Sequence, residues 1–469
     1  MRRSFCYTEA YPTMHLPFYE ELEKLVEKSR DKAGVRPFSW PPFVGGLVGI
    51  FLFYVFFPIA TVHGVELALF LSPLWLPAII LDASWHSWLL LIRSEFIAKQ
   101  KVILLEIRPP RNLAKTPLAM EAVFSAIHYT KGESNWYQKF IQGQVRPYWS
   151  IELVSFGGQV HFYIWTRDNF RKLVENAFYA QYPGVQLVEV EDYTRFITAR
   201  PEEYGVWGCD YKHTDKNDPV PIKTYVDYGL DKTQKEPEQV DPFAHLTEFL
   251  GSMRPGENFW LQIIFRIHNG EKYGVIKPDG KPYTWRDRAK ELVDELRKET
   301  VKTVKYRDVF TGEMRETEGF PNPTKGQSEK IAAIERNVSK LAFDVGIRGV
   351  YVAQPDKFDP VNITGMISLW KPFNVEDRNG LKAAHFGIMF SDYPWEIGNE
   401  RRKDVFRREL VEAYRRRQYF HDPFKMPDPM VMSTEELATI FHIPSGAVAT
   451  PSLARIESAT SEAPVNLPI

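Results

Sequence analysis

The side chains best suited to chemistry in this sequence are arginines gathered near its end: Arg407, Arg408, Arg415, Arg416 and Arg417. They belong to the segment 401–420, RRKDVFRRELVEAYRRRQYF, whose periodicity predicts a basic helix. Guanidinium groups bind phosphate through paired hydrogen bonds, so this helix is a candidate contact surface for DNA or another phosphate-bearing partner. Acidic residues interleave with the arginines, however, and an apolar stripe is formed by Phe406, Leu410 and Tyr414. An amphipathic helix packed on a domain, with a solvated outer face, explains the same pattern.

No catalytic motif is recognisable in the sequence. The nearest approach to a phosphate-binding loop begins at Gly274, but it is one residue too long and has Pro282 where Ser or Thr would bind magnesium. The motifs HExxH and GxSxG are absent, and so is GxGxxG before a helix. His161 lies within a predicted strand, where we expect a packed or hydrogen-bonded structural residue. The sequence therefore predicts a protein that is not an enzyme and binds no cofactor or metal; an enzyme with an unrecognised site is the less favoured alternative.

Composition excludes little and favours a reducing compartment. The chain has 469 residues and a formal net charge of −1, so it has no strong overall field to attract nucleic acid or acidic lipid. Its two cysteines, Cys6 and Cys209, cannot form a disulfide framework.

An uncharged apolar run near the start predicts association with a membrane. Phe43–Val62 has 20 residues and no charge, and about 20 apolar residues cross a bilayer core of about 30 Å. A second apolar stretch, Leu67–Ile92, has one formally charged residue, Asp82. With the short connector 63–66 between them, we expect a transmembrane helical hairpin within 41–100. The alternative is a buried hairpin in a soluble protein.

Basic residues around these runs set the expected orientation. Lys and Arg precede the first run and follow the second, whereas the connector has none. Cytoplasmic flanks carry the excess of Lys and Arg, so both flanks should lie in the cytoplasm, with only the hairpin tip outside. We expect Asp82 at the cytoplasmic interface of the second helix; the alternative is a functional site inside the membrane.

The region 101–200 has the element order of a ferredoxin-like unit. Strands are predicted at 102–108, 150–156, 159–166 and 185–192. Helices are predicted after the N-cap Thr116 and along the segment that follows Thr166, and Gly157-Gly158 is predicted to form a hairpin turn. The order β-α-β-β-α-β makes the expected fold class α+β.

A related order recurs in 201–400, which we expect to be a second, degenerate α/β unit with a charged insertion around 285–323. Its predicted elements are a helix after Asp241, a strand over 259–268, a helix from Ile331 that stops at Gly346, and a strand over 348–354.

The two ends of the chain complete the expected organisation. Residues 1–40 contain an amphipathic cytoplasmic segment that fits either a membrane surface or another domain. Helices are expected within 401–445, the last beginning with a capping box of Ser433 and Glu436. Residues 446–469 are expected to form a linker or tail.

Three strings together resemble a known kind of protein: LLEIRPPRNLAKTPLAMEAVFSAIH, WSIELVSFGGQVHFYIWT with its continuation to VEVEDY, and STEELATIFHIPSG with the later APVNLPI. They resemble a membrane-anchored bacterial family of unknown function that is associated with type IV secretion or conjugation, notably in candidate-phyla bacteria. They are also similar to the amino-terminal, non-motor part of HerA/FtsK-like conjugative ATPases. In those ATPases a comparable tail leads into the motor, and this chain stops at Ile469, so the resemblance implies a separate ATPase polypeptide.

These observations lead to one expected function. The protein would be a multi-pass scaffold of the bacterial inner membrane that docks a separate P-loop ATPase and secretion-channel subunits at the cytoplasmic face, as a homo-oligomer. The ending from Ser433 to Ile469 is the expected docking segment. The alternative is a membrane-tethered DNA-binding component that uses the basic helix 401–420.

Overall fold

The computed structural model describes residues 48–444 with gaps, which are 50, 111–114, 130–134, 198–202, 233–239, 271, 274–276, 278–279, 281–282, 308–313, 386–398 and 427. The expectations for 1–40 and for the tail 446–469 lie outside the described residues, as does part of the first apolar run.

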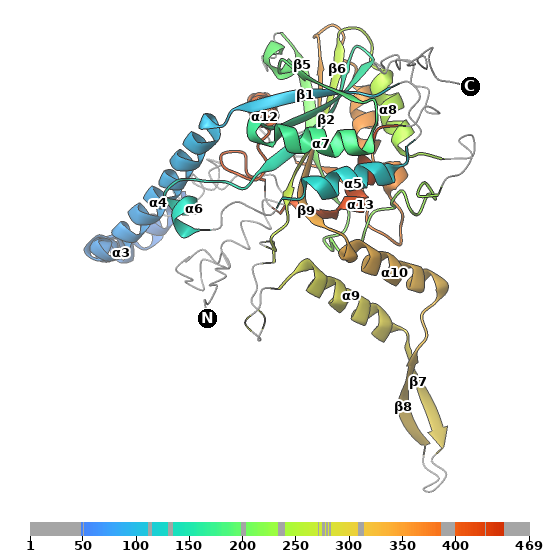
Figure 1. Ribbon diagram of the computed structural model, residues 1–469. Coiled ribbons are helices and arrows are strands. Elements are labelled where there is room, and N and C mark those ends of the chain that lie inside the picture. Colours follow the sequence, from blue (N-terminus) through green and yellow to red (C-terminus); the bar gives the residue numbers. More distant parts are fainter. Residues whose placement is uncertain are drawn as a thin grey trace, which may run out of the picture.

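A large antiparallel sheet lies at the centre of the described molecule, with helices packed around it, so the fold is α+β (Figure 1). Its strands lie in the order β10-β5-β9-β6-β2-β3-β1-β4, and β11 pairs with one end of β9. Most of these strands are rich in β-branched and aromatic residues that suit a pleated, buried surface. Their bounds are β1 Val102–Arg108, β2 Tyr148–Phe156, β3 Gln159–Arg167, β4 Gln186–Val190, β5 Gly205–His213, β6 Glu257–Ile267, β9 Ala342–Ala353, β10 Leu381–Ala384 and β11 Met430–Ser433.

The same strand order occurs in both halves of this sheet. In the first half it is β4-β1-β3-β2, with α5 (Pro117–Ile127) between β1 and β2 and α7 (Arg171–Gln181) between β3 and β4. In the second half it is β10-β5-β9-β6, with α8 (Phe243–Gly251) between β5 and β6 and α11 (Val361–Ser368) between β9 and β10. Numbered along the chain, each half reads fourth, first, third, second. Strands β2 and β6 pair along their length and join the halves into one sheet.

The second half differs from the prediction in where a helix gives way to a strand. The helix expected from Ile331 to Gly346 ends at Ser339 as α10 (Lys325–Ser339), and β9 begins at Ala342. The apolar periodicity continues past the end of the helix, but the backbone there pairs with β6 from Phe343 onward. Sheet pairing therefore overrides the local helical pattern, and the prediction was wrong for these residues.

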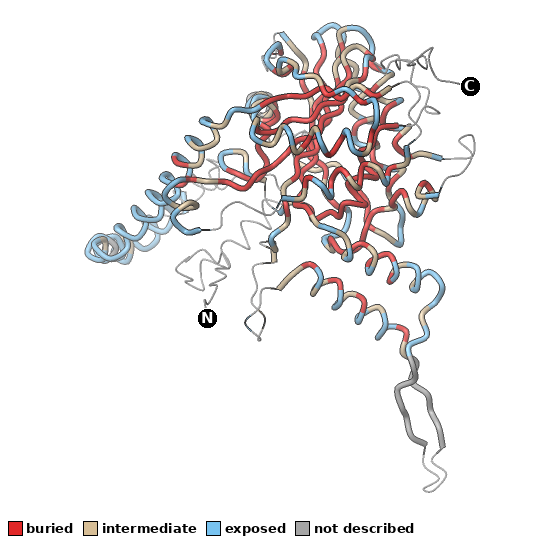
Figure 2. The backbone as a smooth tube through the Cα atoms, viewed as in Figure 1, coloured by how far each residue is buried: buried red, intermediate tan, exposed pale blue. Residues whose placement is uncertain are grey.

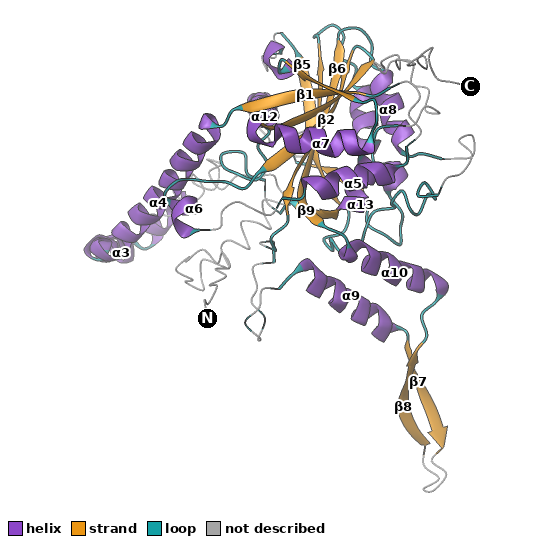
Figure 3. Ribbon diagram, in the orientation of Figure 1, coloured by secondary structure: helices purple, strands orange, loops and turns teal. Residues whose placement is uncertain are grey.

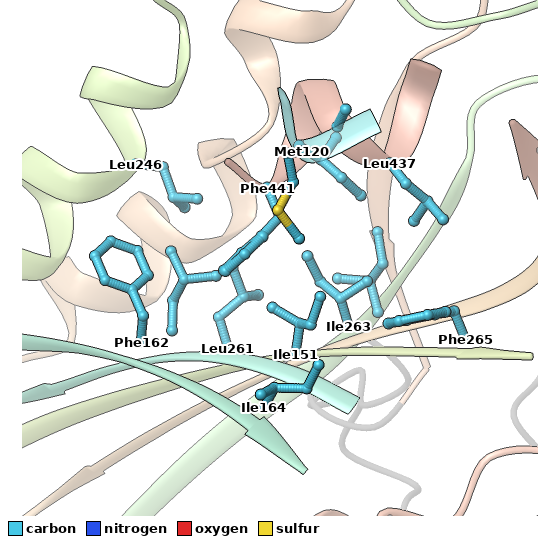
Figure 4. Packing of buried hydrophobic residues seen from close by; sticks show 14 of the residues in the cluster. Met120, Ile151, Phe162, Ile164, Leu246, Leu261, Ile263, Phe265, Leu437 and Phe441 are labelled. Atoms are coloured by element: carbon cyan, nitrogen blue, oxygen red, sulfur yellow. The ribbon is translucent and has the colours of Figure 1, made fainter. Parts of the chain in front are cut away.

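One face of the sheet carries the main apolar core. Ile151, Ile164, Leu261 and Ile263 project from the strands toward the helices that cover them (Figure 4). The helical side of the core comes from α5, α8 and α13 (Thr434–Ile440) and includes Met120, Leu246 and Leu437. Since these residues come from both halves, the sheet and its helices share one buried core, drawn in red in Figure 2.

The charged insertion projects away from this core. It consists of α9 (Trp285–Glu299), a hairpin of β7 (Val301–Arg307) and β8 (Met314–Pro321), and the return helix α10 (Figure 3). The two helices pack against each other through a small apolar cluster that includes Ala289, Val293, Ile331 and Ile334.

The two apolar helices directly before the sheet are α3 (Pro58–Phe70) and α4 (Ser72–Lys99). The connector expected at 63–66 lies inside α3, and the helices meet at Leu71 instead. Proline fits the first turn of a helix but disrupts its interior, and Pro73 marks the start of α4. Among the described residues, α4 is the one helix long and apolar enough to cross a membrane, so they support one candidate span.

Candidate functional site

The basic helix lies across β5 and β9 as α12 (Asn399–Arg415). The predicted apolar stripe is confirmed at Leu410 and Tyr414, which are buried against the sheet, whereas Phe406 is half-buried. Gly208 of β5 permits this close approach, because a Cβ atom there would lie 2.6 Å from Leu410 Cδ2. The inner face of the helix is therefore fixed on the sheet, and only its outer face can meet a partner.

The helix ends earlier than predicted, and this separates the arginines. It was expected to reach Phe420 but ends at Arg415, and Arg416 and Arg417 follow it. Arg417 has a left-handed backbone with φ of 50°. This conformation turns the chain, so that Arg417 points into the molecule and Arg416 outward.

Arg417 lies between two carboxylates in the interior. Its Nε and Nη2 donate to the two oxygens of Glu152, at 2.8 and 3.1 Å, and its Nη1 donates to Asp192 Oδ2 at 2.6 Å. The Arg417 and Glu152 side chains are 1% and 0% exposed. Burial by itself would lower the pKa of Arg417, but the two carboxylates outweigh it and raise that pKa well above its usual value. The guanidinium therefore stays charged and paired.

Glu152 is the centre of a wider hydrogen-bond network. Besides the guanidinium, its carboxylate accepts bonds from Ser150 Oγ at 2.8 Å, Gln262 Nε2 at 3.0 Å and Tyr193 Oη at 2.7 Å. The hydroxyls of Tyr193 and Tyr414 lie 2.8 Å apart. Strands β2 and β6, the turn after β4 and helix α12 thus converge on one buried carboxylate.

Two further buried ion pairs lie in the same sheet. Arg348 Nε donates to Asp210 Oδ1 at 2.9 Å, and Arg348 Nη1 donates to the backbone oxygen of Gln418, just beyond α12. Burial raises the pKa of Asp210 despite this partner. Asp344 is also buried, which would raise its pKa, but a hydrogen bond with His268 at 2.6 Å and nearby guanidinium groups hold that pKa at about 2. Through its bond to Gln418, Arg348 links the sheet to the segment that follows α12.

The outer face of α12 keeps a smaller basic surface than predicted. Arg408 and Arg416 are exposed and Arg407 is half-buried; we call these three the outer arginines. Arg407 pairs with Asp404 at 2.8 Å, and Arg416, just beyond the helix, pairs with Glu412 of α12 at 2.6 Å. Arg415 instead donates to the backbone oxygen of Thr194 at 3.0 Å. Of the five predicted contacts, three face outward and two hold the helix in place.

The C-terminal segment STEELATIFHIP, residues 433–444, is part of the core and not of the surface. Strand β11 pairs with β9, and every residue of α13 is buried. The predicted capping box of Ser433 and Glu436 is confirmed. Glu435 receives a hydrogen bond from Arg336 Nε at 3.0 Å. Residues 433–444 are consequently not available as a docking surface in the folded protein.

The expectation for His161 is confirmed, since its Nδ1 lies 2.7 Å from Glu106 Oε1. Within the described part of the chain, no group of three or more His, Cys, Asp or Glu residues is arranged to hold a metal ion.

Sequence reasoning missed the buried charges beneath α12. Glu152 and Arg348 each interrupt an apolar strand segment, SIELVSF and VGIRGVYV. A charge in such a position needs a buried partner. A charged residue inside an apolar strand segment therefore shows which strands carry buried ion pairs. It does not identify the partners, because Arg417 is 265 residues from Glu152 in the chain.

The fold and this site define an α+β domain whose sheet holds a basic helix through buried ion pairs and which follows an apolar helix. The chain belongs to a family described as a domain of unknown function (DUF8128), which matches residues 93–455. The match begins within α4 and includes both halves of the sheet, α12 and α13. No curated protein matches the chain.

Proposed function

We propose that this protein is a membrane-anchored scaffold without enzymatic activity of its own. The observation that carries the proposal is α4, whose apolar part is almost wholly exposed and extends away from the folded body (Figures 1 and 2). Exposed apolar surface of this extent marks a membrane or protein contact. From Ser72 to Trp88 the helix rises about 24 Å at 1.5 Å per residue, most of a bilayer core of about 30 Å. Asp82 and His86, whose side chains lie 3.5 Å apart, fall in the last turns of this segment, toward the cytoplasmic side.

The proposed partners are a separate P-loop ATPase and channel subunits of a type IV secretion or conjugation-like system at the bacterial inner membrane. The resemblance of the three sequence strings supports this choice. The outer arginines supply a docking surface on the cytoplasmic side, because buried ion pairs hold α12 rigidly on the sheet. A homo-oligomeric scaffold is part of the same proposal.

Purification in detergent tests this function. The isolated chain should hydrolyse no ATP and should co-purify with a P-loop ATPase from its own host. Replacing the three outer arginines by Glu should abolish that association, whereas Lys172→Glu, on the exposed side of α7, should leave it intact. ATP hydrolysis at ordinary ATPase rates by the isolated chain would overturn the proposal.

A second candidate function uses the outer arginines to hold DNA at the membrane. Three phosphate contacts would make the logarithm of the DNA affinity fall with the logarithm of salt concentration, with a slope of about −3. The Arg408→Gln and Arg416→Gln variants should each reduce that slope by about one. DNA binding that is unchanged in both variants would remove this candidate.

Two finer descriptions accompany the proposal. We propose that the first apolar run adds a second crossing, which makes a hairpin; reporters fused at Met1 and Ile469 should then both be cytoplasmic, and finding them on opposite sides would contradict it. We also propose that each half of the sheet is a ferredoxin-like unit, an assignment supported by the strand order shared by the two halves.

A further inference from the structure

A short helix beside α4 presents a cluster of exposed aromatic and aliphatic side chains. Helix α6 (Trp136–Phe140) is capped by Asn135, whose side chain accepts a hydrogen bond from the Tyr137 amide. Trp136, Tyr137 and Ile141 are 63%, 50% and 39% exposed. We call these three residues the α6 patch. Large side chains that are exposed together need a partner or a non-aqueous surrounding.

The α6 patch is held at a fixed height along α4. Trp88 Nε1 donates to the backbone oxygen of Phe140 at 3.0 Å, and the rings of Trp85 and Phe140 lie 5.5 Å apart. After α6 the chain passes so close to α4 that a Cβ atom on Gly143 would lie 2.4 Å from the Ile92 oxygen. The φ of Gly143, +64°, also favours glycine. The short helix and α4 therefore form one rigid corner.

This corner lies at the boundary between the exposed part of α4 and the part that packs against the folded body. Toward Ser72 the helix is apolar and exposed, whereas Leu89 and Ile92 are buried against the body. Trp85 and Trp88, at the boundary, are themselves partly exposed. Tryptophan and tyrosine gather at the level of lipid headgroups, because their rings suit the apolar side and their N–H or O–H groups suit the polar side.

We infer that the α6 patch lies in the headgroup layer of the bilayer that α4 enters, and that it sets the depth and tilt of that helix. The inference rests on the proposed membrane anchor. A lipid surface is the occupant that fits, because the patch continues the exposed apolar surface of α4 and combines aromatic rings with polar tips. Because the protein would contact the bilayer at two places, α4 and α6, the orientation of the whole sheet relative to the membrane would be fixed.

Spin labels on the full chain in lipid nanodiscs test this inference. Single cysteines replace Tyr137 or Ile141 in the α6 patch, Ile80 in α4, or Lys172 on α7, in a Cys6→Ser background; Cys209 is buried and does not need replacement. Collision rates with oxygen, which enters lipid, and with a water-soluble nickel complex are measured at each site. The label at Ile80 should collide mostly with oxygen and the label at Lys172 mostly with nickel. Labels at Tyr137 and Ile141 should lose much of the nickel collision seen at Lys172.

The outcomes separate the two proposals. Labels at Tyr137 and Ile141 that meet nickel as freely as Lys172, while Ile80 is in lipid, would overturn the headgroup contact and leave the anchor standing. A label at Ile80 that meets nickel as freely as Lys172 would overturn the anchor and this inference together. Both patch positions are partly exposed side chains, so neither label removes a core contact.

Discussion

The buried arginine at the end of α12 explains why a basic run in the sequence is only partly a binding surface. Arg417 is paired with Glu152 and Asp192 in the interior, whereas its neighbour Arg416 is exposed. A buried ion pair adds little net stability, because desolvation offsets the attraction, but removing one partner leaves an uncompensated charge. The two adjacent arginines therefore have different roles that sequence alone does not distinguish.

Replacing these arginines should give very different losses of stability. Arg417→Ala leaves two carboxylates without their cation and should lower the free energy of unfolding by about 3 to 5 kcal/mol. Arg416→Ala, at an exposed site, should change it by less than about 0.5 kcal/mol. Thermal unfolding of the detergent-solubilised chain measures both. Equal losses would show that the network around Glu152 is not formed.

Glu436 should make stability depend on pH near neutrality. Burial raises its pKa from 4.5 to about 7. A carboxyl whose pKa is raised by folding stabilises the native state below the unfolded pKa, and this stabilisation is lost as pH rises from about 4.5 through about 7. Between pH 4.5 and 8 the native protein should lose about 3 kcal/mol relative to Glu436→Gln, which does not titrate there. Denaturant unfolding of both proteins at several pH values measures this, and a pH-independent difference would contradict it.

At the scale of elements, the sequence predicted those features correctly that depend only on neighbouring residues. The turn Gly157-Gly158 and the capping box of Ser433 were predicted and are present, because each depends on neighbouring residues. Helix ends were not reliable. The apolar spacing after Ser339 and the basic run after Arg415 both continue a helical pattern, and pairing with distant strands or carboxylates decides the outcome.

Helix α7 provides a test of the first half of the sheet. On this helix Val174, Ala177 and Phe178 are buried, whereas Leu173 is half-buried. Phe178→Ala should therefore lower the free energy of unfolding by about 3 to 5 kcal/mol. Lys172→Ala, on the exposed side of the same helix, should change it by less than about 0.5 kcal/mol. Similar melting temperatures for the two variants would mean that α7 packs through another face.

At the scale of the whole molecule, segments that lie far apart in the chain meet in one core. Strand β11 and α13 pack with β9 and α5, although most of the chain separates them from α5. The sequence predicted the α+β class and the element order of the first half. It did not predict that the two halves share one sheet or that the C-terminal helix completes the core, because such contacts join residues 110 to 313 positions apart.

Two truncations should separate folding from docking. A chain that ends at Pro444 keeps β11 and α13 and should melt at the temperature of the full chain. A chain that ends at Asp428 loses both elements, exposes the apolar surface that they cover, and should not fold cooperatively. Circular dichroism on heating measures each. Loss of the co-purified ATPase from a Pro444 form that melts like the full chain would assign docking to residues 445–469. Equal melting temperatures for the Pro444 and Asp428 forms would contradict the packing of β11 and α13.

The pairing of β2 with β6 has a consequence for how such a chain assembles. These are the second strands of the two halves, and they run antiparallel. Equivalent strands that meet in this way surround an axis of two-fold rotation, as in an isologous homodimer. The two halves of the sheet are therefore related in the way that the two subunits of a symmetric dimer are, although they belong to one polypeptide. A fragment limited to the first half would expose β2 as a long edge, and we expect two such fragments to pair through it and to sediment at twice the monomer mass.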